Sequence, residues 1–125
     1  MKVVFFSESG IVGKVDRKFP NARNDIAWSI MMNADWCPYG KTPTEKYDLG
    51  VVTIPKTKPN LDVDWFKQYC DKIAIMQEGP HWYFQDYSVE QQFQFVENLR
   101  KADWVWCHNK SDVSYYEGLG CQDVR

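Results

Sequence analysis

The amino-acid sequence predicts an α/β fold in which helices cover both faces of a mostly parallel sheet of about four strands. Two observations indicate this fold class: short apolar runs recur along the chain, and segments with helical apolar spacing separate them. Strands joined by helical crossovers form right-handed βαβ units, which build a parallel sheet. With 125 residues, 44% hydrophobic and 26% charged, the chain has the size and composition of one globular domain. We therefore expect residues 1–125 to form a single Rossmann-like three-layer sandwich.

Four apolar runs are the predicted strands, and each is followed by Gly, Pro or polar residues that end it. They span residues 3–6, 49–54, 73–76 and 104–107. A continuous apolar run of this length is typical of a strand that is buried on both faces, as in a parallel sheet. Residues 7–21 and 35–46 contain several Gly and Pro and are predicted as loops.

Helical patterns follow each predicted strand. The strongest begins at Ser88, which precedes Gln91 by three residues and forms a capping box with it; an apolar stripe of Phe93, Val96 and Leu99 continues this helix. Another helix begins at Asn24, with Ile26, Ala27, Ile30 and Met31 at helical spacing. Two shorter helices are predicted over residues 62–70 and 111–117.

The last five residues resemble the approach to a fifth strand. Four strands make a thin sheet, so one edge is expected to need a cover. That cover is either further chain or a partner, and a second copy in a homodimer is one such partner.

Charge, hydropathy and cysteine spacing exclude several classes of protein. The net charge is −2, which provides no basic field for nucleic acid or an anionic membrane. No apolar run approaches the roughly 20 residues of a membrane span. The four cysteines, at positions 37, 70, 107 and 121, form no CxxC pair and lack the spacing of metal ligands. We expect reduced thiols, no metal and a cytoplasmic location.

Ligands of open parallel sheets bind outside the carboxyl ends of the strands. Both histidines of the chain, His81 and His108, follow predicted strands at that edge. His81 lies in a run dense in polar and aromatic residues, and its imidazole can take a proton from a hydroxyl group. Trp82 and Tyr83 either offer flat faces on which a sugar ring stacks or pin the loop to the core. A surface or structural role for each histidine remains the alternative.

Two further segments have the residue types of a binding site. The loop with Gly10 and Gly13 lacks the first glycine of the dinucleotide fingerprint, and the next helix begins too late to grip a pyrophosphate. Arg23 and Asn24 bring a guanidinium and a capping side chain to a helix start. They either hold a substrate hydroxyl or phosphate, or simply cap the helix.

Four segments, in this order, resemble the N-terminal domain of GT-B glycosyltransferases, in particular phage and bacterial enzymes that use nucleotide sugars. They are residues 2–6 with the glycine-containing loop, 23–28, 75–81, and 102–109 followed by Asp112. The last segment has the family's Ala-Asp pair, apolar strand and short polar loop. The resemblance spans nearly the whole chain and is carried by order and spacing.

This resemblance implies a two-domain enzyme in which this chain is the acceptor half and the other half holds the nucleotide sugar, a co-substrate; no cofactor is implied. The isolated chain is then expected not to transfer sugar. Glu78 and His81 are the implied catalytic candidates on the acceptor side, and the Gly10–Gly13 loop would face the donor phosphates. The remaining implied substrate-binding residues are Arg23, Asn24, Trp82, Tyr83, His108, Asn109 and Asp112.

Two alternatives belong to other classes. The first is a small nucleoside deoxyribosyltransferase-like enzyme with Asp112 and Glu117 as its carboxylates. That family has Asp-Ser-Gly-Thr near this position, whereas this chain has Asp-Val-Ser-Tyr. The second is a non-catalytic binding or assembly module whose sheet is completed by a partner.

Overall fold

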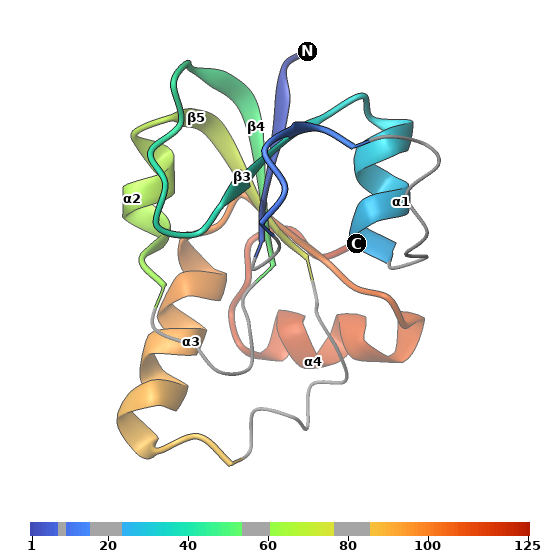
Figure 1. Cartoon of the computed structure of the whole chain (residues 1–125). Helices are drawn as coiled ribbons and strands as arrows, with labels where there is room; N and C mark the ends of the chain where they lie inside the picture. The colour runs from blue at the N-terminus through green and yellow to red at the C-terminus, as the bar shows by residue number, and fades with distance from the viewer. Residues whose placement is uncertain (8–9, 16–23, 54–60, 77–85) are drawn as a thin grey trace.

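A mixed sheet of six strands forms the centre of the computed structural model, which describes residues 1–7, 10–15, 24–53, 61–76 and 86–125 (Figure 1). The strands lie in the order β2-β3-β1-β4-β5-β6, and every neighbouring pair is parallel except β2 with β3. Their bounds are β1 Val3–Ser7, β2 Gly13–Lys14, β3 Asp35–Pro38, β4 Tyr47–Thr53, β5 Cys70–Met76 and β6 Trp104–Trp106. The predicted α/β class with a mostly parallel sheet is confirmed.

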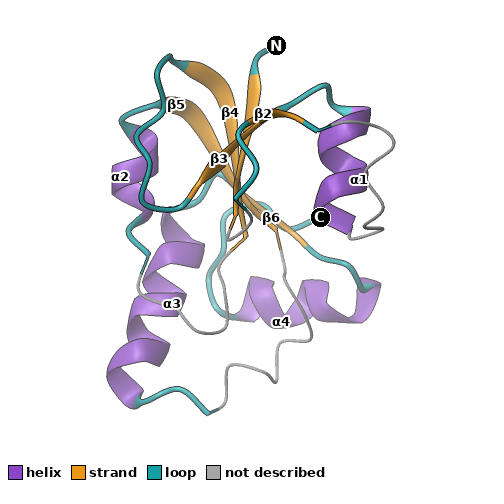
Figure 2. Ribbon diagram, viewed as in Figure 1, coloured by secondary structure: helices purple, strands orange, loops and turns teal. Residues whose placement is uncertain are grey.

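Helices lie on both faces of this sheet (Figure 2). They are α1 Asn24–Met31, α2 Val63–Lys67, α3 Val89–Lys101 and α4 Val113–Gly118, the last preceded by a short 3-10 helix, Lys110–Asp112. Ile26 of α1 is buried against one face of the sheet, while buried side chains of α2, α3 and α4 pack against the other. The chain therefore forms the expected three layers.

Alternation along β1 explains why the apolar runs are continuous. Val3 and Phe5 are buried in the core on the α1 side, whereas Val4 and Phe6 are buried in the core on the α2 and α3 side. Successive side chains of a strand point to opposite faces, so a strand covered on both faces is apolar at every position.

The direction of the chain reverses at β1. From β1 it passes through α1 to β3 on one side, and then to β4, β5 and β6 on the other. The parallel strands thus follow the doubly wound order 2-1-3-4-5, with a topological switch point between β1 and β4. Ligands of such sheets bind beside the carboxyl ends of the strands at this point.

The predicted number of strands is wrong: the sheet has six, not about four. β3 lies in a segment predicted as loop because Asp35 and Pro38 are typical of loops. Its two central residues, Trp36 and Cys37, are buried in the cores on opposite faces, and β3 pairs in parallel with β1. Tertiary burial overrides local composition here. β2, at Gly13, is a two-residue edge strand with too little sequence for a periodic signal.

The predicted apolar stripes of two helices are wrong in part. In α1, Ile26 is buried but Met31 is 84% exposed. In α3 the capping box of Ser88 and Gln91 is confirmed, whereas Phe93 is 69% exposed. The buried face of α3 is formed by Phe95, Asn98 and Leu99. Because the polar residue Asn98 lies on the buried face, the apolar pattern alone does not identify which face of α3 is buried.

The outer edge of β6 is paired by the end of the chain itself. Val124 forms a parallel bridge with Val105, whose backbone N–H donates to the carbonyl of Asp123 at 2.8 Å. The expected approach to a further strand is thus confirmed, and residues 123–125 cover the edge that was expected to be open. Within the described ranges, no helix is long and apolar enough to cross a bilayer.

Candidate functional site

A pocket of about 480 Å³ lies at the carboxyl ends of β1 and β3, next to the topological switch point. We call it the aromatic pocket. It lies between the loop that follows β3 and the start of α2, and its lining residues are Phe6, Pro38, Tyr39, Gly40, Thr42, Leu61, Asp62, Trp65 and Phe66. A concave site of this size, mostly apolar with a few polar groups, has the properties of a small-molecule site.

Four rings build the aromatic pocket. Phe6 and Phe66 are almost fully buried, with ring centroids 4.6 Å apart. Tyr39 and Trp65 are half-buried and lie around this pair, Tyr39 with its centroid 6.4 Å and Trp65 with its centroid 5.1 Å from that of Phe66. The buried rings fix the position of the half-exposed ones. Tyr39 and Trp65 therefore present aromatic surface that the fold holds in place.

Backbone and capping hydrogen bonds anchor both walls of the aromatic pocket. The N–H of Tyr39 donates to the carbonyl of Ser7 at 3.2 Å, and its hydroxyl donates to the carbonyl of Thr53 at the end of β4. On the other wall, Asp62 is the N-cap of α2 and accepts from the N–H of Asp64 at 3.0 Å. This cap places the Asp62 carboxylate one helical turn before Trp65. The pocket thus combines a rigid aromatic surface with a carboxylate.

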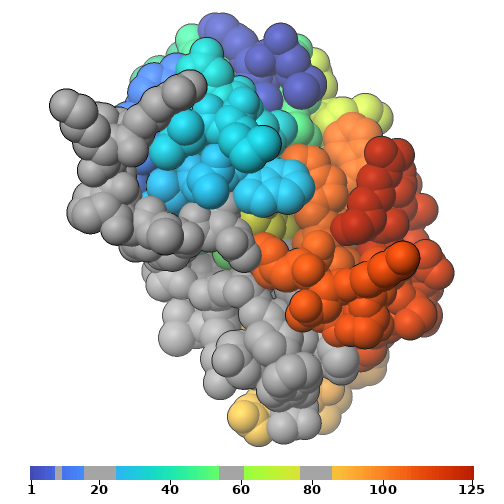
Figure 3. Space-filling model, turned by 90° about the vertical axis from the view of Figure 1, so that its right-hand side faces the viewer, coloured from blue at the N-terminus to red at the C-terminus, as the bar shows by residue number. Residues whose placement is uncertain are grey.

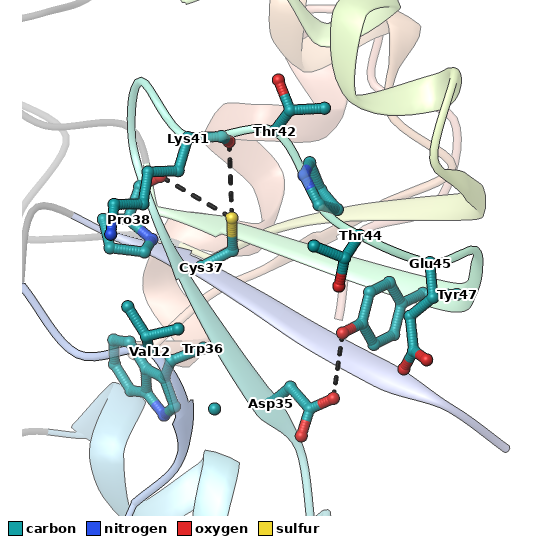
Figure 4. Close-up of a pocket in the computed structure, with 12 residues that line it drawn as sticks. Val12, Asp35, Trp36, Cys37, Pro38, Lys41, Thr42, Thr44, Glu45 and Tyr47 are labelled. Atoms are coloured by element: carbon teal, nitrogen blue, oxygen red, sulfur yellow. Dashed lines mark hydrogen bonds between the residues drawn. The ribbon is translucent and has the colours of Figure 1, made fainter.

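A second pocket, of about 430 Å³, lies on the other side of the loop that follows β3 (Figure 4). We call it the polar pocket; it is lined by residues 12–13, 35–38 and 41–45 and by Tyr47. Asp35 receives a hydrogen bond of 2.9 Å from the Tyr47 hydroxyl, and its other oxygen lies 3.1 Å from the Lys14 ammonium. Partial burial acts to raise the pKa of the Asp35 carboxyl, but Lys14 and Tyr47 outweigh it and hold that pKa below its ordinary value.

This lowered pKa predicts a pH-dependent contribution to stability. A carboxyl whose pKa is depressed by folding stabilises the protein above its unfolded-state pKa of about 3.9, and this stabilisation is lost as the pH falls through the folded-state pKa. The free energy of unfolding of the wild type should exceed that of Asp35→Asn at pH 6, and the difference should shrink at pH 3. Urea denaturation of both proteins at the two pH values measures it. An equal difference at both would contradict the role of the Asp35 charge.

All four cysteines are free thiols, two of them buried. Burial raises the pKa of Cys70 to about 12 and those of Cys107 and Cys121 to about 11. Because the thiolate is the nucleophile and metal ligand, these raised pKa values disfavour reaction and metal binding at neutral pH. In the part of the chain that the structure describes, no cluster of three or more His, Cys, Asp or Glu side chains could hold a metal ion.

The predicted site residues fall into three groups. Glu78, His81, Trp82, Tyr83 and Arg23 lie outside the described residues. His108 and Asn109 follow the edge strand β6 and are exposed, while Asp112 is buried at the start of α4. Gly10 is exposed near β2, Gly13 lines the polar pocket, and Asn24 begins α1. None of the described members of this set lines the aromatic pocket.

Asp112 and Glu117, the carboxylates of the nucleoside-enzyme alternative, differ in accessibility. Asp112 is only 4% exposed, whereas Glu117 lies on the exposed side of α4. A carboxylate that attacks or protonates a substrate has to reach it. The described geometry gives this alternative no support.

On the α1 side of the molecule, α1 lies against the C-terminal part of the chain (Figure 3). Trp28 of α1, 45% exposed, lies with its ring centroid 5.4 Å from that of Trp106 in β6. Because these rings belong to the α1 face of the sheet and the aromatic pocket opens on the α2 face, Trp28 offers a matched control for substitutions in the pocket.

Comparison with known proteins gives no relative: no protein-family model, curated protein or solved structure matches this chain. The function therefore has to be inferred from the chemistry of the two pockets. The sequence analysis does not identify Tyr39, Asp62 and Trp65 as candidate site residues, although they line the aromatic pocket. The available signal was Asp62 at the start of a predicted helix that follows a strand, because such a helix start lies at the carboxyl edge of the sheet.

Proposed function

We propose that this chain is a saccharide-binding domain of a glycosyltransferase and that its aromatic pocket receives the sugar acceptor. One observation carries the proposal: two half-buried rings and a carboxylate line one pocket beside the topological switch point. The C–H face of a pyranose packs on rings such as Trp65 and Tyr39, which combine apolar area with low conformational entropy. The Asp62 carboxylate can accept hydrogen bonds from neighbouring sugar hydroxyls.

The charge of the aromatic pocket favours an acceptor over a nucleotide sugar. Among the described residues that line it there is no Lys or Arg, and Asp62 is the charged group. A diphosphate needs cationic side chains or a helix N-terminus free of a carboxylate cap, and α2 is capped by Asp62. A neutral saccharide has neither requirement.

A non-catalytic saccharide-binding module is the second candidate. It is favoured because no His or Cys occurs among the described residues that line the aromatic pocket, so these residues supply binding groups and no base that titrates near neutrality. Neither candidate predicts sugar transfer by the purified chain alone, so turnover in a transfer assay with nucleotide sugars would contradict both.

Substitutions in the aromatic pocket should weaken saccharide binding. Trp65→Leu removes the stacking surface and is expected to raise the Kd by about tenfold, the factor for about 1.4 kcal/mol. Asp62→Asn removes the charge but keeps an N-cap side chain, so it should weaken binding without unfolding α2. Titration of the ¹⁵N-labelled chain with glucose, galactose, maltose and cellobiose, followed by NMR, measures both effects.

Trp28→Leu is the matched control, because it makes the same substitution at an exposed tryptophan outside the pocket. It should leave the saccharide Kd unchanged. If none of the four sugars shifts the amide signals of Asp62 and Trp65, the aromatic pocket is not a saccharide site and the proposal fails. If Trp28→Leu weakens binding as much as Trp65→Leu, the site lies elsewhere.

A further inference from the structure

The polar pocket exists because a crossover helix is missing. β3 and β4 are parallel strands on either side of β1, yet residues 39–46 connect them without a helix. Parallel strands are usually joined by a helix that covers the sheet face. Here the short connection leaves the α2 face of β3 open, and Cys37 and Tyr47 contribute to the lining of the resulting pocket. The opening is thus a consequence of the topology.

The polar groups of this pocket converge. The hydroxyl of Thr44 points toward the Tyr47–Asp35 pair in Figure 4. Glu45 lies close enough to Tyr47 that, after burial and Asp35, its charge contributes to raising the pKa of the phenol. Two carboxylates and two hydroxyls from three different segments therefore surround one space.

Both carboxylates of the polar pocket are already paired. Asp35 is paired with Lys14, and Glu45 is paired with Lys2 at 3.0 Å. Both carboxylates have a cationic partner and Lys41 also lines the pocket, so there is no excess negative charge to attract a metal cation, while each carboxylate has lone pairs beyond those its partner uses. Such a site suits an uncharged ligand with several hydroxyl donors.

The apolar side of the pocket completes this description. Val12 and Pro38 line it together with the polar groups, and the volume of about 430 Å³ is that of a site for a small ligand. A sugar ring has one apolar C–H face and a rim of hydroxyls, which matches one apolar wall opposite a polar one. The polar pocket therefore has the chemistry of a monosaccharide subsite.

We infer that the polar pocket is a second subsite of the same acceptor, so that the acceptor is a neutral oligosaccharide with one unit in each pocket. The two pockets share Pro38 and Thr42 in their walls, which makes them immediate neighbours. One unit stacks on Trp65 and Tyr39, and the next donates hydroxyl hydrogen bonds to Asp35 and Glu45. This inference rests on the proposed saccharide function of the aromatic pocket.

The test compares a monosaccharide with disaccharides on the ¹⁵N-labelled chain. Glucose is expected to shift the amides of Asp62 and Trp65 alone, whereas maltose or cellobiose shifts these and also the amides of Thr44 and Glu45. Shifts by both disaccharides that stay within the aromatic pocket overturn the second subsite and leave the proposed function standing. Shifts confined to the polar pocket, or none in either, overturn both.

Substitutions at Thr44 give a second, independent measurement. Thr44 is exposed and its change to valine keeps the shape of the side chain, so folding should be preserved. Thr44→Val is expected to raise the Kd of the disaccharide by about tenfold, the factor for a lost hydrogen bond of about 1.4 kcal/mol. Thr44→Ser retains the hydroxyl and should bind as the wild type does, and neither variant should alter glucose binding. Equal disaccharide affinity in both variants overturns the subsite.

Discussion

Replacing Gly50 with alanine is expected to lower the free energy of unfolding by about 2 kcal/mol, because the centre of β4 has no room for a methyl group. A Cβ at this position would lie 2.7 Å from the Cys70 sulfur, 3.0 Å from Cδ1 of Ile73 and 3.2 Å from Cε2 of Phe6. All three side chains are almost fully buried. Overpacking costs about 1–3 kcal/mol, whereas removing a glycine from the unfolded chain returns only about 0.4–1 kcal/mol. Gly50→Val should cost more still.

Three further variants separate overpacking from other effects of the substitution. Gly118→Ala is the matched control, since a Cβ at Gly118 meets no atom within 4 Å. Without a clash, this substitution should raise the free energy of unfolding by about 0.4–1 kcal/mol. Cys70→Ala removes the closest atom, so the double variant with Gly50→Ala should be more stable than the sum of the single effects predicts. Urea denaturation measures the wild type and these variants, and strict additivity would show that the Cys70 contact is not the cause.

Burial on both faces determined which strands could be predicted. β1, β4 and β5 were found because their apolar runs are continuous, and α3 was found because its cap is a local motif of Ser88 and Gln91. β3 was missed because its ends are Asp35 and Pro38, and what makes it a strand is its pairing with β1, which the local sequence does not contain. Non-local pairing and burial are thus the missing information.

The site was less predictable than the fold for the same reason. The aromatic pocket requires Tyr39 and Trp65, from segments 26 positions apart, to meet over Phe6. Neither ring carries a local motif, and Trp65 reads as an ordinary residue of an amphipathic helix. The polar pocket depends on a crossover that lacks its helix, which becomes visible only once β3 is known to be a strand. The sequence could predict the sheet edge at which the aromatic pocket lies, but not the residues that line it.

Replacing Asn98 with leucine is expected to destabilise the fold by about 3 kcal/mol and to weaken saccharide binding as well. Asn98 of α3 is fully buried and holds the start of α2: its Oδ1 accepts from the N–H of Val63 at 3.2 Å, and its Nδ2 donates to the carbonyl of Leu61. Leucine fills a similar volume but leaves both backbone groups without this partner, at about 1–3 kcal/mol for each buried group. Because Asp62 lies between these two residues, the loss reaches the aromatic pocket directly.

The side-chain amide of Asn98 provides one donor and one acceptor, and different substitutions distinguish their contributions to stability. Asn98→Asp keeps an acceptor for Val63 but turns a carboxylate oxygen toward the carbonyl of Leu61, so at pH 7 it should be at least as destabilising as Asn98→Leu. Gln94→Leu, one turn earlier on α3 and half-buried, is the control and should change neither stability nor binding. Thermal unfolding and cellobiose titration measure the two effects. Asn98→Leu could instead lower the stability and leave the Kd for cellobiose unchanged. The rings alone would then hold the aromatic pocket, and the buried amide would serve only the packing of α2 on α3.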